Sequence, residues 1–259
     1  MKTIAALLTL FSIAAPAWAQ APDPRAQSIV DEADRRLSGY GDFTATLTMT
    51  LREPGGSERV REMHILGLEV PGQGDKTLVV FSLPRDLRGT SILTVTHRES
   101  PSDQWIHLPA IRRTRRIAGS SRSDSFMGSE FTFEDIGSRD LRQYRYRYLR
   151  GEALGGTATH VLERFPLDEN SGYGRQILWM DTEEYRLLRI DYYDRDGAHV
   201  KSLRLDGYRR YAGGQWRPDR MVMNDLASGK STMLEWREYA FGVGLSDDDF
   251  DPRRLGRRR

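Results

Sequence analysis

The residue types that most often carry out chemistry are scattered along this sequence. Its five histidines occur singly, without the H-x-x-H or H-E-x-x-H spacing that brings two imidazoles to one metal ion. There is no cysteine and no G-x-S-x-G stretch that would present a nucleophilic serine. The acidic run SDDDFD at 246–251 lacks the glycine and the distal glutamate of a calcium loop. We therefore predict no catalytic residues, no metal and no cofactor, although carboxylates that pair only in space leave a secreted hydrolase as an alternative.

A basic cluster lies directly before an aromatic run in the middle of the chain. The aromatic run, SFMGSEFTFEDI at 125–136, is unusual in a polar chain whose net charge is only +2. We interpret the basic cluster as a docking surface for an acidic partner or an anionic lipid head group, which charge reversal would disrupt. A solvated face is the alternative interpretation. The residues of the cluster are Arg112, Arg113, Arg115 and Arg116.

Tyrosine and arginine alternate in QYRYRYLR at 143–150. Such a pattern could stack nucleic-acid bases. Because the net charge is nearly balanced, we favour a strand with tyrosines on one face and arginines on the other, and we expect no nucleic-acid partner.

The N-terminus has the pattern of a secretory signal peptide. Lys2 precedes an apolar run that ends in the small-x-small sequence Ala17-Trp18-Ala19, which predicts cleavage after Ala19. A membrane anchor is the alternative. We expect residues 20–259 to form a single domain in the periplasm, with a basic tail from about residue 252. This domain would contact a membrane only transiently. Without cysteine the domain has no disulfides and no site for lipidation, so its stability depends on its core.

The elements that would position these residues are a helix and many strands. Apolar residues at helical spacing in DPRAQSIVDEADRRL predict one amphipathic helix, which Gly39 and Gly41 end. From Phe43 the period changes to two, and about eleven strands follow with short turns between them. Short links imply antiparallel neighbours. The expected fold class is α+β, mainly β: one large curved antiparallel sheet forming a half-open barrel.

One face of such a sheet must be covered. The helix and the irregular segment around 111–140 are the candidate covers, and they are small for so many strands. This mismatch predicts an apolar hollow between sheet and cover. Methionines at positions 49, 63, 221 and 223 would suit a wall that adapts to flexible ligands.

The stretch QWIHLPAIRRTRRIAGSSRSDSFMGSEFTFEDI resembles the outer-membrane lipoprotein-sorting protein family, which is LolA/LolB-like and includes the periplasmic lipoprotein carrier. The resemblance is carried by W-x-x-L-P at Trp105, Leu108 and Pro109, by the arginine cluster, and by S-F-M-G-S-x-F. It implies a half-open β-barrel whose lid covers a lipid-binding cavity. It implies a protein that is not an enzyme. The expected ligands are lipid or lipoprotein acyl chains, which the protein would move toward the outer membrane. The resemblance also implies a monomer whose partner is an exporter of the resistance-nodulation-division (RND) type.

These arguments select two sets of residues. The predicted cavity wall comprises Phe43, Ala45, Leu47, Met49, Leu51, Val79, Phe81, Leu93, Val95 and Trp105. The predicted lid comprises Phe126, Met127, Gly128, Phe131 and Phe133. The competing hypothesis is a docking module for the exporter that carries no lipid and has a filled core.

Overall fold

We analysed a computed structural model, which describes residues 23–97, 100–137, 141–211 and 213–257. The predicted signal peptide lies outside the described residues. Helix α1 spans Pro24–Leu37. The Asp23 side chain caps it by accepting hydrogen bonds from the amides of Arg25 and Ala26, and Gly39 follows its end with φ of 84°.

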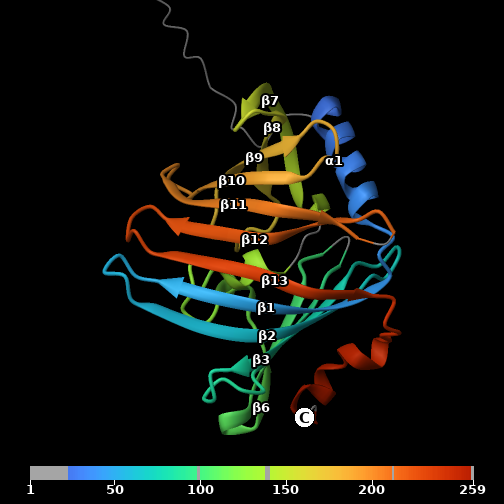
Figure 1. The fold of residues 1–259 in the computed structure, drawn as a ribbon, viewed down its shortest axis with the longest axis vertical. Coiled ribbons are helices and arrows are strands. Elements are labelled where there is room, and N and C mark those ends of the chain that lie inside the picture. The colour runs from blue at the N-terminus through green and yellow to red at the C-terminus, as the bar shows by residue number, and fades with distance from the viewer. Residues whose placement is uncertain (1–22, 98–99, 138–140, 212, 258–259) are drawn as a thin grey trace, which may run out of the picture.

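Thirteen strands form one sheet in the order β6-β5-β4-β3-β2-β1-β13-β12-β11-β10-β9-β8-β7 (Figure 1). All neighbouring pairs are antiparallel. The first six strands are β1 Asp42–Arg52, β2 Glu58–Leu68, β3 Lys76–Leu83, β4 Ser91–Val95, β5 Asp103–Leu108 and β6 Arg113–Arg116. The other seven are β7 Tyr144–Leu154, β8 Thr157–Pro166, β9 Arg175–Asp181, β10 Leu187–Tyr193, β11 His199–Arg210, β12 Trp216–Asp225 and β13 Ser231–Phe241.

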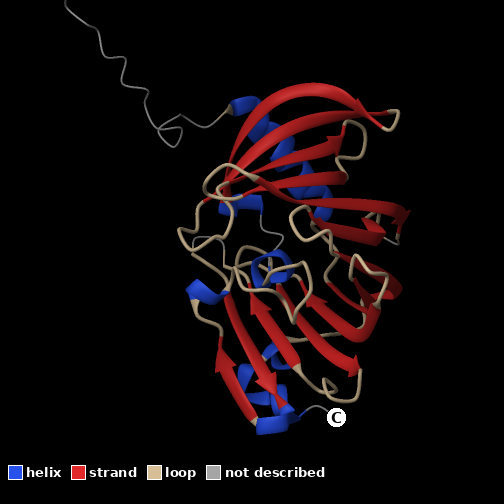
Figure 2. Cartoon of the chain, turned by 90° about the vertical axis from the view of Figure 1, so that its left-hand side faces the viewer, coloured by secondary structure: helices blue, strands red, loops and turns tan. Residues whose placement is uncertain are grey.

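The sheet is not closed, because its edge strands β6 and β7 do not pair with each other. It curves around α1 and around the loops of the segment between β6 and β7, which we call the central segment, residues 117–143 (Figure 2). The expected half-open, mainly antiparallel α+β fold is therefore confirmed. The sheet has thirteen strands where about eleven were expected, and the strand that no apolar pattern marked is β6, which contains three of the four arginines of the basic cluster.

Helix α1 covers one end of the concave face. Its apolar stripe, Ala26, Ile29, Val30 and Ala33, is buried against residues of β7, β8 and β9. The Asp23 carboxylate also accepts a hydrogen bond of 2.8 Å from the Tyr148 amide. This contact gives a partner to one backbone donor of β7, an edge strand that would otherwise be open to pairing with another chain.

The convex face has a smaller core of its own beneath the C-terminal residues. Two short 3-10 helices, η5 Asp247–Phe250 and η6 Pro252–Arg257, place Phe250 and Leu255 against Leu78 and Leu93. Phe250 and Leu255 are each 3% exposed. The end of the chain, expected to be a basic tail, is thus a packed element up to Arg257 in the described residues.

Candidate functional site

The concave face of the sheet is apolar across most of its width. From β1 the buried side chains of Ala45, Leu47, Met49 and Leu51 all lie in one core cluster with Val79 and Phe81. Phe43 packs against the same cluster but is only partly buried. The four methionines singled out by sequence are members as well. Because side chains alternate along a strand, one face of β1 supplies this whole set.

Three residues of the predicted wall lie on the opposite face, so this part of the prediction was wrong. Leu93 and Trp105 are cross-strand partners of each other, and Val95 belongs with them in the cluster beneath the C-terminal helices. The residues of β4 and β5 that reach the concave cluster are Ile92 and Ile106. A shift of one position exchanges the two faces of a strand.

The aromatic residues of the central segment fill the middle of the hollow. Phe126 is 1% exposed; its ring lies 6.2 Å from that of Phe81 and 5.4 Å from that of Phe133. Phe131 is also buried, and Met127 is partly buried in the same cluster. Gly128 has φ of 76°, which a glycine adopts without strain and which turns the chain between the two buried phenylalanines.

Polar hydrogen bonds tie the central segment to the sheet around these aromatic residues. The Glu130 amide donates to Oγ1 of Thr232 at 3.0 Å, and Nζ of Lys201 donates to the Glu130 carbonyl at 2.8 Å. The Gln104 side chain donates to the Phe133 carbonyl at 3.0 Å. Hydrogen bonds of this kind each contribute only modestly to stability, because water can replace them when they break.

A short helix within the central segment, α2 Phe133–Gly137, carries two partly buried acids, Glu134 and Asp135. Asp135 accepts hydrogen bonds from the Thr132 amide and hydroxyl, both at 2.8 Å, and from the Tyr173 hydroxyl at 3.0 Å. Burial, together with the charge of Asp135, raises the pKa of Glu134 to about 7. Burial also raises the pKa of Asp135. These carboxyl groups are part of the contact between segment and sheet.

A second group of aromatic side chains lies where β1 begins and β13 ends. Phe43 packs against Tyr239 and Phe241 with ring centroids 5.8 Å apart in each case, and Trp236 stacks on Tyr239 at 5.8 Å. All four are partly buried. Phe43, Trp236 and Tyr239 also pack against the main core cluster, so they continue the apolar concave face.

The arginines of the basic cluster are all exposed. Arg113 and Arg115 pair in register with Leu108 and Ile106, so they share the concave side, whereas Arg116 pairs with Trp105 and forms an ion pair with Asp103. Arg112 precedes the strand with φ of 50°. The docking role of this cluster stays a prediction.

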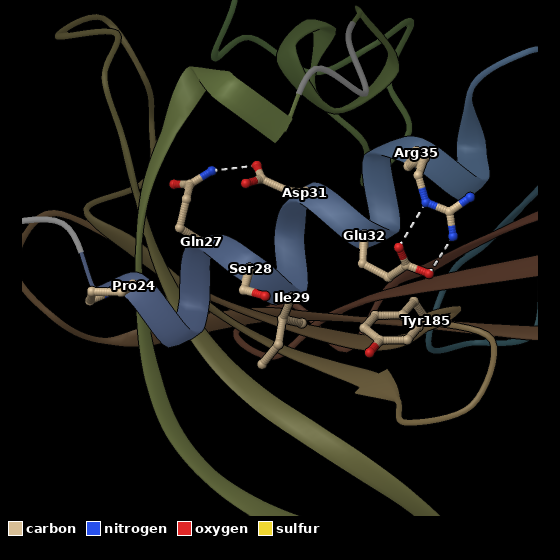
Figure 3. Close-up of a pocket in the computed structure, with 8 residues that line it drawn as sticks. All are labelled: Pro24, Gln27, Ser28, Ile29, Asp31, Glu32, Arg35 and Tyr185. Carbon is tan, nitrogen blue, oxygen red and sulfur yellow. Dashed lines mark hydrogen bonds and ion pairs between the residues drawn. The ribbon is translucent and has the colours of Figure 1, made fainter.

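A separate open depression of roughly 680 Å³ lies over α1 (Figure 3). Its wall is largely the polar side of the helix, where Gln27 donates to Asp31 at 2.7 Å and Glu32 binds Arg35. In the part of the chain that the structure describes, no group of three or more histidine, aspartate or glutamate side chains could hold a metal ion. The described residues also include no helix that is long and apolar enough to cross a membrane.

An open antiparallel half-barrel, with a helix and loops over its apolar concave face, is a LolA-like fold. The chain is similar to an outer membrane lipoprotein-sorting domain from Vibrio parahaemolyticus, with 39% identity, a TM-score of 0.87, and coverage of 90% of this chain and 98% of that one. The protein belongs to the outer-membrane lipoprotein-sorting family, and the predicted resemblance is confirmed.

Two further solved structures are similar. A DUF1329 family protein from Desulfovibrio piger has 29% identity and a TM-score of 0.83, with coverage of 89% of this chain and 98% of that chain. A LolA superfamily protein from Nitrosomonas europaea has 24% identity, a TM-score of 0.71 and coverage of 87% and 97%, which shows a shared fold. A family model described as "Uncharacterized protein" matches residues 73–257. No curated protein matches the sequence. The fold is that of a carrier and binding superfamily and not of an enzyme family.

Proposed function

We propose that this protein is a periplasmic carrier that binds lipid, or the acyl chains of lipoproteins, on the concave face and moves them toward the outer membrane. The observation that supports this function is the construction of the cover. Phe126 and Phe131 lie on an apolar sheet face, and the segment that carries them also makes polar hydrogen bonds to the sheet at its margin. An acyl chain can take the place of such side chains.

The energetics of exchange favour this arrangement. Burial of an acyl chain contributes about 0.8 kcal/mol per methylene. The displaced phenylalanines would lose a comparable amount of burial, so ligand entry need only compensate for the released hydrogen bonds. Three methionines of the wall, Met49, Met63 and Met223, are each 0% exposed. Their flexible side chains would adapt to acyl chains of different shape.

A disulfide tether tests whether the central segment must move. The amide of Glu130 lies 3.0 Å from the Thr232 hydroxyl, and the chain has no native cysteine that could interfere. We expect the double variant Glu130→Cys/Thr232→Cys to take up a fluorescent 12-carbon fatty acid when reduced and to lose uptake when oxidised. The readout is fluorescence enhancement on binding.

A matched control places a disulfide away from the segment. Ala153→Cys/Ala158→Cys joins an exposed cross-strand pair of the β7–β8 hairpin, and its oxidation should leave uptake unchanged. Equal uptake by the oxidised and reduced tether would show that the central segment is a fixed plug. Native mass spectrometry of the purified wild-type protein, with lipid extraction, gives the independent measurement. A protein that retains no lipid and takes up no acyl ligand contradicts the proposed function.

A further inference from the structure

A row of polar side chains crosses the concave face at one end of five adjacent strands. The strand register pairs these residues one after another from β7 to β11. Side chains two positions apart on a strand point to the same face of the sheet. Each polar residue stands two positions from an apolar residue of the concave face, so the polar residues lie on that face as well. The members of this polar row are Tyr146, Arg164, Gln176, Tyr192 and Lys201.

The arginine in the polar row is buried. Arg164 is 9% exposed, its Nε donates to Oε1 of Gln176 at 2.7 Å, and its guanidinium lies 4.0 Å from the ring centroid of Tyr144. Its nearest surroundings are thus an amide and phenol rings. A guanidinium has five N–H donors and stays protonated, so a buried one is a strong site for an anionic acceptor.

The next positions on the same strands are entirely aliphatic. Two residues along from the polar row lie Leu162, Leu178, Ile190 and Leu203, which also pair with one another in register and are at most 6% exposed. The concave face therefore changes from cationic and hydroxylic to aliphatic within two residues of strand, about 7 Å. This polarity matches an amphiphile with an anionic head and an acyl chain.

The central segment places the carboxyl group of Asp135 close to the polar row. Asp135 binds the hydroxyl of Tyr173, whose ring centroid lies 4.7 Å from that of Tyr192 and 5.9 Å from Nζ of Lys201. The charge of Lys201 opposes the effect of burial on the pKa of Asp135. Lys201 also donates to the Glu130 carbonyl of the segment. Release of the segment frees the lysine and removes the carboxylate together.

We propose that the polar row is the head-group end of the hollow, that it takes an amphiphile bearing a phosphate, and that Asp135 holds the anion position until such a ligand displaces it. This inference rests on the carrier function proposed above. The ligand's phosphate would accept hydrogen bonds from Lys201, Arg164 and the Tyr192 hydroxyl. Its chain would lie over Leu178, Ile190 and Leu203, the part of the aliphatic row that α1 does not cover. Charge-assisted hydrogen bonds of this kind are short and strong.

The test compares ligands that differ only in the phosphate. Dissociation constants of the full mature protein are measured by isothermal titration calorimetry for 14-carbon lysophosphatidic acid, for the monoacylglycerol with the same chain, and for inorganic phosphate alone. We expect the wild-type protein to prefer lysophosphatidic acid over the monoacylglycerol by about tenfold or more, since hydrogen bonds to charged groups are stronger than those between neutral groups. Inorganic phosphate should bind far more weakly than the lipid.

Variants locate the preference. Lys201→Gln also removes a bond to the central segment, so the ratio of the two lipid affinities is the informative quantity, and it should fall toward one. Arg204→Gln makes the same charge change on the exposed face of β11 and should leave the ratio unchanged. Asp135→Asn should tighten binding of lysophosphatidic acid severalfold, because it removes the competing charge and keeps the hydrogen-bonded shape.

Each outcome has a distinct meaning. Equal affinity for the two lipids overturns the head-group assignment but leaves the carrier function intact. Binding of neither lipid overturns both. Inorganic phosphate that binds as tightly as lysophosphatidic acid assigns the polar row to free phosphate and overturns the lipid ligand. A ratio that falls equally in Lys201→Gln and Arg204→Gln shows a general charge effect and also overturns the proposal.

Discussion

Glu134 and Asp135 are adjacent carboxyl groups on a helix that closes over the sheet, and burial is the largest influence on both. For Glu134, burial and the charge of Asp135 outweigh hydrogen bonds from Ser171 and from the Gly172 amide, and its pKa rises to about 7. Arg122, which is paired with Asp168 at 2.6 Å, lowers that pKa. A carboxyl group in this position is most stable when it is protonated.

The sign of its effect on stability follows by linkage. In the unfolded chain the pKa of Glu134 is near its ordinary value of 4.5, so between about pH 4.5 and 7 the folded state binds more protons than the unfolded state. We predict that Glu134 lowers the free energy of unfolding progressively across this window, by about 3 kcal/mol at most above pH 7. The measurement is urea unfolding of wild type and Glu134→Gln from pH 4.5 to 8, taken as a difference.

An exposed acid gives the control. Glu183→Gln removes a carboxylate from an exposed turn residue and should shift stability little at any pH. A difference between wild type and Glu134→Gln that is flat with pH would contradict the prediction. The difference between the two variants also removes the contribution of the other acids, such as Asp181, whose pKa is lowered.

At the scale of elements, the C-terminal helices act as a second cover, on the convex face. Leu255 of η6 packs with Phe250 over Leu78 and Leu93. A Cβ on Gly256 would lie 2.6 Å from Cε1 of His107, so the backbone of η6 approaches β5 closely. Glycine permits this approach, and the apolar side chains beside it supply the burial.

We predict that Leu255→Ala lowers the free energy of unfolding by about 2–4 kcal/mol, the usual range for deletion of a buried leucine side chain. Leu226→Ala removes the same atoms from a side chain that is 49% exposed and should change stability by less than about 0.5 kcal/mol. Denaturant unfolding with an unchanged slope is the measurement. Equal effects of the two substitutions would mean that the C-terminal helices do not stabilise the sheet.

The elements also show which parts of the site the sequence could predict. Strict alternation in β1 assigned Ala45, Leu47 and Met49 to one face correctly, since polar threonines occupy the other face. Alternation was absent in β4, SILTV, where four of five residues are buried. Both faces of β4 are covered, by the central segment and by the C-terminal helices, so the pattern could not distinguish Ile92 from Leu93.

Two features of the site have weaker signals in the sequence. Strand β6 consists of four exposed residues, three of them arginines, and no apolar pattern marks it. The polar row depends on the register of four successive strand pairs from β7 to β11, which the sequence pattern does not specify. Arg164 lies on the same face of β8 as Leu162. A charged residue on an otherwise apolar face is the local signal in the sequence that indicates the polar row.

At the scale of the whole molecule, the sheet consists of two continuous meanders, β1–β6 and β7–β13, joined through the pair β1 and β13. The central segment is the covalent link between them and also packs across both. Nine register positions between β1 and β13 are paired, and Met49 and Leu234 meet among them in the core. The two meanders therefore share a core and a backbone ladder, independent of the link.

We predict that the protein remains one folded unit after its covalent link is cut. A specific protease site can be inserted after Ser120, because residues 118–120 are exposed. Cleavage there cuts the chain between the two meanders. The two fragments should co-elute at the size of the intact protein and separate only in denaturant. Fragments that dissociate in native buffer would show that the β1–β13 pair and the shared core are insufficient. Insertion without cleavage is the control.

The β1–β13 pair also sets the order in which the chain can fold during its synthesis. Leu47 emerges early and its partner Trp236 near the end, so β1 lacks one of its two neighbours until β13 is made. Contacts so distant in sequence form slowly. The central ladder therefore cannot form before nearly all of the chain is available.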